Sequence, residues 1–544
     1  MDKNRRRLII SISVIFFSAA GFALLTALLV NIFNRKQESK ETYVRFVEVN
    51  EDTVDATEWG KNWPRQYDGY RRTGEPTRTK YGGGVSGEGE VPEQKAVKDP
   101  WLTRLFSGYL FSLDYRDRRG HAFMLHDQEV TKRNVPQEAK QSGNCLHCHA
   151  SIMPLYRSKG SAALPNGTAE EQIQKGLEIV GSMNYWDAHK DLGALSKVEG
   201  KVGKPHPVSC VDCHQPSTME LRVTRPGFIT GIQELAKSDV PTPHLPSIER
   251  WRKGPRTTPY NPNVDGTRQE LRSYTCGQCH VEYFCGKGTT IFFPWQKGLQ
   301  VEQIEASFNE RKLPDGKRFK DWTHAETGME VLKAQHPEFE VWSQGIHAKS
   351  GVSCADCHMP YKREGAMKVS EHWIKSPLTM VNRACQTCHP YPEEDLRSRV
   401  ETIQDRHYAL LSRAGAASVS MLDSIKSVRA PVTAKNASTA LTAAKDKLSK
   451  DPAYLAMDEG AKKKKLESEI AAQQLTLWRA LVERDPKLKE IEELQRGAQW
   501  RLDFVAAENS MGFHAPQELA RILGESIDLS RQAQVKATEY LQKK

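Results

Sequence analysis

The sequence is short of apolar residues, since only 38% are hydrophobic while 27% carry a charge. In a chain of 544 residues this balance favours a water-soluble body over a multi-span membrane protein, with room for two or more domains. The sequence also lacks a stripe of lysine and arginine interleaved with aromatic residues. The formal charge of +10 therefore does not indicate nucleic acid as a partner.

One long apolar run is present, at the N-terminus. Residues 8–30 contain no charge and follow Arg5, Arg6 and Arg7. As a helix this run is about 35 Å long, which is enough to cross the hydrocarbon core of a bilayer. No small-x-small cleavage site follows it, which favours an uncleaved anchor, with a cleaved signal peptide as the alternative. In both cases the arginines stay inside, so we expect the body on the periplasmic side of the cytoplasmic membrane.

Cysteine is scarce outside one repeated pattern. Ten of the eleven cysteines form five CxxCH motifs, whereas chance predicts about 0.01 such motifs. The motifs comprise Cys145, Cys148 and His149; Cys210, Cys213 and His214; Cys276, Cys279 and His280; Cys354, Cys357 and His358; and Cys385, Cys388 and His389. Two thiols followed by an imidazole are typical of covalent attachment of haem c. Five CxxC units do not pair into structural zinc sites, and zinc does not explain the histidines. Cys285, the remaining cysteine, is predicted to be a small buried hydrophobe.

The chain changes character near Pro392. Residues 145–389 are rich in proline, glycine and polar residues, so we expect short helices and loops around the porphyrins. Beyond Pro392 the pattern is helical, and Asp451-Pro452 and Asp485-Pro486 indicate helix starts.

The expected fold class is mainly α. It comprises a multihaem cytochrome c body of short helices and loops, a long-helix C-terminal bundle and one N-terminal transmembrane helix. The predicted domains are residues 1–40 as signal anchor and linker, 41–391 as pentahaem catalytic domain, and 392–544 as a helical region suited to dimerisation.

Several segments outside the haem motifs carry a family resemblance. The order of the five motifs, with "CGQCHVEY", "KAQH", "HAKSGVSCADCHMP", "EHWIKSPL" and "DFVAAENSMGFHAP", resembles the pentahaem, ammonia-forming cytochrome c nitrite reductases. The resemblance extends from about Glu58 to Leu523. It implies six-electron reduction of nitrite to ammonium by a homodimer with five covalently bound haem c groups and calcium. It also implies a membrane quinol dehydrogenase cytochrome c as electron donor, and hydroxylamine, nitric oxide or sulfite as secondary substrates.

The resemblance assigns axial ligands to the haems. The motif histidines become the proximal ligands, and the first haem is catalytic while the other four are bis-histidine relays. The implied distal ligands are His372 for the second haem, His121 for the third, His514 for the fourth and His347 for the fifth. No distal histidine is assigned to the first haem, which leaves its sixth position open to substrate.

The resemblance also implies the residues of the substrate pocket. They are Arg133, Tyr283 and His336, with positions 116, 118 and 119 as alternatives for the arginine. Nitrite is an anion whose N–O bonds break as protons arrive, so a fixed cation and proton donors suit the reaction.

A calcium site is implied beside this pocket. Its ligands match the carboxylate of Glu282, the backbone carbonyls of Tyr283 and Lys333, and the amide oxygen of Gln335. Oxygen donors of this kind suit a hard cation.

The first motif departs from the commonest form of the family, which has CxxCK. Here His149 takes the place of the lysine, as in a smaller branch of the family, and His147 within the motif is expected at the surface. Axial ligand identity sets the reduction potential, so this exchange changes the potential expected of the first haem. If the first haem is closed by a sixth ligand, the alternative function is a membrane-anchored multihaem electron carrier without a substrate site.

Overall fold

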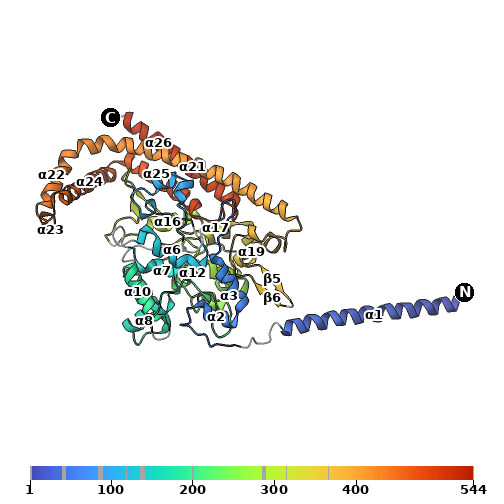
Figure 1. Ribbon diagram of the computed structural model, residues 1–544. Coiled ribbons are helices and arrows are strands. Elements are labelled where there is room, and N and C mark those ends of the chain that lie inside the picture. Colours follow the sequence, from blue (N-terminus) through green and yellow to red (C-terminus); the bar gives the residue numbers. More distant parts are fainter. Residues whose placement is uncertain are drawn as a thin grey trace.

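The computed structural model describes residues 3–38, 45–83, 90–117, 119–134, 141–198, 201–284, 290–313, 315–365 and 367–542. Helices dominate these residues (Figure 1). The described strands form three antiparallel pairs: β1 (Lys197–Val198) with β2 (Lys201–Val202), β3 (Trp322–Thr323) with β4 (Glu330–Val331), and β5 (Tyr361–Glu364) with β6 (Met367–Ser370). The predicted mainly α fold class is confirmed.

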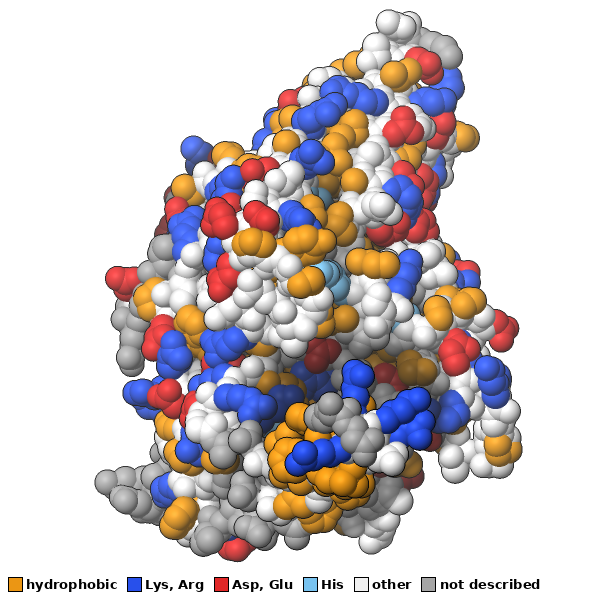
Figure 2. All heavy atoms as spheres, turned by 90° about the vertical axis from the view of Figure 1, so that its right-hand side faces the viewer, with side chains coloured by type: hydrophobic (Ala, Val, Ile, Leu, Met, Phe, Trp, Pro, Cys, Tyr) orange, Lys and Arg blue, Asp and Glu red, His pale blue; other side chains and the backbone are white. Residues whose placement is uncertain are grey.

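The N-terminal helix α1 (Lys3–Glu38) extends away from the body in Figure 1. Its span Lys3–Asn34 is the one described helix long and apolar enough to cross a membrane, and none of its apolar window is buried. In Figure 2 this helix points toward the viewer, with apolar side chains in orange and basic side chains around them. A membrane anchor and a signal sequence share these properties.

The body consists of short helices joined by loops. Its α-helices are α2 (Ala56–Asn62), α3 (Pro64–Arg71), α4 (Lys95–Lys98), α5 (Trp101–Leu105), α6 (Met124–Val130), α7 (Leu146–His149), α8 (Met153–Ala163), α9 (Ala169–Ser182), α10 (Tyr185–Leu195), α11 (Cys210–Cys213), α12 (Pro226–Lys237), α13 (Pro246–Lys253), α14 (Pro262–Asp265), α15 (Arg268–Gly277), α16 (Val301–Glu310), α17 (Glu338–Gln344), α18 (Ile346–Lys349), α19 (Cys354–His358) and α20 (Val381–Ala384). Its 3₁₀ turns are η1 (Arg72–Gly74), η2 (Leu110–Ser112), η3 (His121–Phe123), η4 (Lys132–Asn134), η5 (Gly143–Cys145) and η6 (Pro377–Thr379).

The backbone of each CxxCH motif forms a helical turn. In three of them the amide of the histidine donates to the carbonyl of the first cysteine, four residues earlier, over 2.9–3.0 Å; these are His214, His280 and His389. A turn of this kind brings both thiols and the imidazole to neighbouring positions along the helix.

Long helices form the C-terminal part of the chain. They are α21 (Glu393–Lys435), α22 (Ala437–Leu448), α23 (Pro452–Leu455), α24 (Glu459–Arg484), α25 (Pro486–Ala507) and α26 (Pro516–Gln542). Asp451 and Asp485 cap α23 and α25, accepting hydrogen bonds from Ala453 N and Lys487 N, which confirms the two predicted starts. Figure 1 shows α21, α25 and α26 packed along one side of the body.

The C-terminal helices share a hydrophobic core with the body. One cluster of buried side chains combines Phe106 and Val331 of the body with Leu411 of α21, Trp500 of α25 and Leu519 of α26. Burial of such large apolar groups stabilises the junction by about 2 kcal/mol for each side chain. The helical region that starts at Glu393 is therefore packed as part of the body, and it positions the late histidine discussed below.

Candidate functional site

Four of the five motif histidines face a second histidine across a gap of nearly constant width. The ring centroids lie 6.1 Å apart for His214 and His372, 6.4 Å for His121 and His280, 6.4 Å for His358 and His514, and 6.3 Å for His347 and His389. Two imidazoles that share one metal through bonds of about 2 Å have centroids roughly 6 Å apart. Each pair thus has the spacing needed to ligate one iron, and the pairs are those that the resemblance implies.

Backbone carbonyls orient several of these imidazoles. Nδ1 lies 2.9–3.1 Å from a carbonyl oxygen in His149, His214, His358 and His372; the acceptors are Met124, Met219, Lys375 and Ser370, respectively. A carbonyl only accepts, so Nδ1 carries the proton in each ring. Nε2 is left with its lone pair, which is the state that ligates a metal.

The first motif differs from the other four. Among the described residues, no ring contact joins His149 to another histidine. Burial lowers the pKa of His149 to about 4, and the positive charge of Arg133 acts in the same direction. His149 is therefore a neutral, oriented imidazole with a cation nearby.

Arg133 has few partners of its own. Its Nε donates to the Thr131 hydroxyl over 3.3 Å, and its guanidinium carbon lies 4.3 Å from the centroid of the Phe111 ring. It forms no ion pair with any carboxylate in the described part of the chain. A guanidinium held in this way keeps charge available for an anion.

The alternative arginines are engaged elsewhere. Arg116 Nε lies 2.7 Å from a carboxylate oxygen of Asp114. Arg119 pairs with Asp127 and stacks on Phe123. Arg118 lies outside the described residues.

A hydrogen bond joins the segments that carry Tyr283 and His336. The amide of Gln335 donates to Glu282 Oε2 over 2.6 Å. Tyr283 follows Glu282 and His336 follows Gln335, so both lie next to this hydrogen bond. Burial lowers the pKa of His336 well below its usual value, and the charges of His280 and His149 contribute. His336 is thus a neutral imidazole close to both motif histidines.

Glu282 is fully buried and incompletely paired. Its Oε1 has no hydrogen-bond partner, and burial raises the pKa of its carboxyl well above the usual value. Its neighbour Glu340 is also buried and has an unpaired oxygen, while its other oxygen accepts from Trp295 Nε1 over 2.7 Å and from Glu282 N over 3.0 Å. Two buried carboxyls this close need a compensating proton or cation.

Comparison with known proteins decides the family. The family model for cytochrome c552 matches residues 55–544, nearly the whole body. The chain belongs to the cytochrome c552 family. As a member of that family it carries haem c.

Relatives and solved structures agree with this assignment. Cytochrome c-552 of Parabacteroides distasonis is 31% identical over 510 residues, covering 93% of this chain and 80% of the relative. Cytochrome c-552 of Porphyromonas gingivalis is 30% identical over 487 residues, covering 88% and 75%. The cytochrome c nitrite reductase of Desulfovibrio desulfuricans matches with a TM-score of 0.64 at 26% identity, covering 91% of this chain and 88% of that one. The catalytic subunit of that reductase has two calcium sites.

The cysteines of this chain suit haem attachment. All ten described cysteines are free thiols, and each belongs to one of the five motifs. Thiols are the groups that form the thioether bonds of haem c, and the paired imidazoles supply axial ligands. The residues present therefore fit the cofactor. Cys285 lies outside the described residues.

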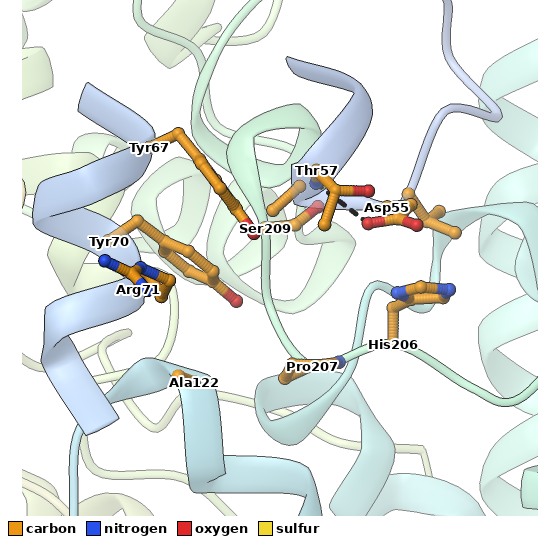
Figure 3. Close-up of a pocket in the computed structure, with 11 residues that line it drawn as sticks. Asp55, Thr57, Tyr67, Tyr70, Arg71, Ala122, His206, Pro207 and Ser209 are labelled. Atoms are coloured by element: carbon orange, nitrogen blue, oxygen red, sulfur yellow. Dashed lines mark hydrogen bonds between the residues drawn. The ribbon is translucent and has the colours of Figure 1, made fainter. Parts of the chain in front are cut away.

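A cavity of about 220 Å³ lies beside the second motif. Figure 3 shows Tyr67 and Tyr70 of α3 on one side of it and Asp55 and His206 on the other. Ser209, which precedes the first cysteine of the motif, also lines it. The cavity thus belongs to the surroundings of the second motif.

The expected surface position of His147 is wrong. The side chain is fully buried, with Nδ1 2.9 Å from the Tyr156 hydroxyl. The close approach of Gly227 explains this burial, since a Cβ at that glycine would lie 3.2 Å from His147 Nε2. Burial lowers the pKa of His147 well below its usual value.

Two functional contacts were missed from the sequence. The Met124 carbonyl orients His149, but no side chain signals the role of a backbone oxygen. Glu340 supports the backbone of Glu282 from 58 positions away. Its place in "PEFE", shortly after "KAQH", is a weak signal that it lies near the pocket.

Proposed function

We propose that this protein is a dissimilatory nitrite reductase that converts nitrite to ammonium. The reaction consumes six electrons and eight protons per nitrite and releases two water molecules with the ammonium ion. The observation that carries the proposal is the contrast between four closed histidine pairs and the unpaired His149, which lies near Arg133. The first haem would bind substrate, and the other four would deliver electrons.

The proposed ligand set accounts for all five haems. The motif histidines would be proximal ligands, with His149 in the place of the lysine found in the commonest form. The distal ligands would be His372, His121, His514 and His347 for the second to fifth haems, as the four ring distances support. Bound haem would relay electrons from the donor and supply the iron that binds substrate.

The side chains around the first motif would handle charge and protons. Arg133 would attract and orient the nitrite anion, because its guanidinium has no described carboxylate partner. The hydroxyl of Tyr283 would donate a hydrogen bond to a departing oxygen, and His336 would pass protons to it. His336 suits this task because burial holds it neutral, so it accepts a proton at one nitrogen while donating from the other.

We propose calcium as the second cofactor. The unpaired Oε1 of buried Glu282 supports it, because a cation would offset the cost of that buried charge. Lys333 and Gln335 are buried next to this carboxylate and would contribute a backbone carbonyl and an amide oxygen, with the carbonyl of Tyr283 as fourth ligand. In the described part of the chain no cluster of three acidic, imidazole or thiol side chains forms a metal site, so carbonyl and amide oxygens have to supply most ligands.

We further propose an uncleaved N-terminal anchor and a homodimer. The anchor would hold the body on the periplasmic side of the cytoplasmic membrane, where a membrane quinol dehydrogenase cytochrome c would donate electrons. The apolar window of α1, none of which is buried, supports the anchor. The intact mass of protein extracted from membranes tests it: a mass that includes residues 3–38 is expected, and a soluble protein lacking them would show a cleaved signal.

The experiment that tests the function is product stoichiometry. Purified protein receives reduced viologen and nitrite, and nitrite lost, ammonium formed and viologen oxidised are counted against a nitrite-free control. About six electrons per nitrite, with ammonium as sole product, are expected. Haems that are reduced by viologen without loss of nitrite would overturn the proposal and leave the multihaem electron carrier as the function.

A further inference from the structure

Arg225 lies where the first motif meets the second. Its side chain is fully buried. Nε donates to the carbonyl of His147 over 2.6 Å, and Nη2 donates to the carbonyl of Ala150 over 2.8 Å. These two carbonyls flank Cys148 and His149, so the guanidinium fixes the end of the helical turn that carries the first motif.

The same guanidinium contacts a residue inside the second motif. Its Nη1 lies 2.8 Å from Oδ1 of Asp212, which stands between the two cysteines of that motif and is 1% exposed. The other oxygen of Asp212 accepts from Ser209 N over 2.8 Å and from the Ser151 hydroxyl over 2.5 Å. A buried ion pair with all these hydrogen bonds links the first and second attachment segments.

The third motif joins the same network through Gln278. This residue also stands between the two cysteines of its motif. Its Oε1 accepts from Thr224 N over 3.0 Å and from Arg225 N over 3.2 Å, and its Nε2 donates to the carbonyl of Asp212 over 3.1 Å. Three attachment segments are thus tied to one buried pair of opposite charges.

Arg225 also contacts the attachment segment of the third motif. The backbone N–H of Arg225 donates to Gln278, and Cys279 follows Gln278 directly in the chain. Since Arg225 also holds the carbonyls of His147 and Ala150, the first and third attachment segments both contact this one residue. The charge of Arg225 therefore lies where the attachment segments of the first and third motifs meet.

We propose that Arg225 and Asp212 are positioning residues that fix the first three haems relative to one another and set the reduction potential of the third. Reduction adds one electron to a haem, so a nearby cation favours the reduced form and a nearby anion opposes it. In the native pair the two charges largely cancel, and removing one leaves the other unopposed in the interior. The proposal rests on haem attachment at Cys276 and Cys279, which is part of the proposed function, and does not depend on nitrite as substrate.

The test is a potentiometric titration of the holoprotein, followed by optical absorption and by the EPR signals of low-spin ferric haem. Arg225→Gln should lower the midpoint potential of a low-spin haem, and Asp212→Asn should raise it. Unit charges about 10 Å apart at an effective dielectric of about 20 change such an equilibrium about tenfold, or about 59 mV for one electron. The double variant should return close to the native potential.

Arg222→Gln is the matched control. Arg222 also donates to the second motif, at the carbonyl of Val211 over 2.8 Å, but it pairs with the half-exposed Glu51. Because Glu51 is half exposed, solvent screens this pair, and the substitution should shift the midpoints by less than Arg225→Gln does. A variant enters the comparison only if its intact mass shows that it carries all five haems.

Opposite shifts for the two single variants separate an electrostatic role from a structural one. Shifts in the same direction, or no shift with all haems present, would overturn the proposal. If Arg225→Gln does not accumulate, Arg225→Lys takes its place and should keep the native potential. Asp212→Asn should still raise the potential. A lower or unchanged potential in Asp212→Asn would then overturn the proposal. The titration needs no substrate, so its result is independent of whether nitrite is reduced.

Discussion

The carboxylate of Glu282 accepts a hydrogen bond from the backbone N–H of Gln335 over 2.6 Å, and thereby joins two segments that are 53 residues apart. Tyr283 follows the acceptor and His336 follows the donor. One buried carboxylate thus fixes the relative position of the two proton-handling side chains of the proposed pocket. A cation on its unpaired oxygen would tighten the same junction.

Glu282→Gln should weaken calcium binding and lower nitrite turnover together. The amide keeps an acceptor for Gln335 N but loses the negative charge that a hard cation requires. Calcium affinity should fall at least tenfold, as metal analysis after dialysis against limiting calcium would show. Glu234→Gln, which changes an exposed carboxylate paired with Lys237, is the control. An unchanged calcium content in Glu282→Gln would remove this carboxylate from the metal site.

Tyr283→Phe should lower nitrite turnover by roughly 10- to 100-fold, because it removes one hydrogen-bond donor for the departing oxygen. The haem content and the midpoint potentials should stay the same. Tyr260→Phe removes a hydroxyl that bonds to Ser247 and Tyr274 in the core, and it should leave turnover unchanged. Equal turnover in the two variants would show that the Tyr283 hydroxyl takes no part in the reaction.

The sequence predicted the helical parts of the fold well because their signals are local. The Asp451 and Asp485 caps need only a side chain and an amide two residues later, and both form as expected. The period of apolar residues likewise predicts the long C-terminal helices without reference to the rest of the chain.

The contacts that the sequence did not reveal are tertiary. Arg225 acts through backbone carbonyls more than 70 positions earlier in the chain, and Glu340 acts on the amide of Glu282. His147 is buried beside Tyr156 and Gly227, which are distant from it in the chain or on another helix. No local pattern encodes such contacts, since they depend on how short helices pack against one another.

His372→Ala should convert the second haem from a closed to an open site. His372 lies 6.1 Å from His214, ring centroid to centroid, and no other histidine ring is in contact with His214 among the described residues. Loss of the sixth ligand should add one high-spin ferric signal per molecule in EPR. His126→Ala, at a half-exposed position outside the four pairs, should leave the spectrum unchanged. A His372→Ala protein that keeps the native low-spin intensity would refute the assigned pair.

Glu492→Gln should destabilise the protein in a pH-dependent way. Glu492 is 1% exposed, pairs with Arg479, and accepts from Lys489 Nζ over 2.8 Å and Glu330 N over 3.0 Å. Burial by itself raises the pKa of Glu492, but these hydrogen bonds and charges outweigh it and lower the pKa below the usual value.

The sign of the pH effect follows from that lowered pKa. Stability from this carboxylate is fully present above its unfolded pKa of about 4.3 and is lost as the pH falls through the lower folded pKa. The variant should lose about 2 kcal/mol at pH 7, and the difference in Tm from the native protein should shrink below about pH 4. Glu490→Gln is the control on the same helix, because Glu490 forms an exposed pair with Lys536 whose loss should cost less than about 1 kcal/mol. A Tm difference for Glu492→Gln that does not change with pH would mean that the loss comes from packing, and that the charge of this carboxylate does not stabilise the junction of α24, α25 and β4.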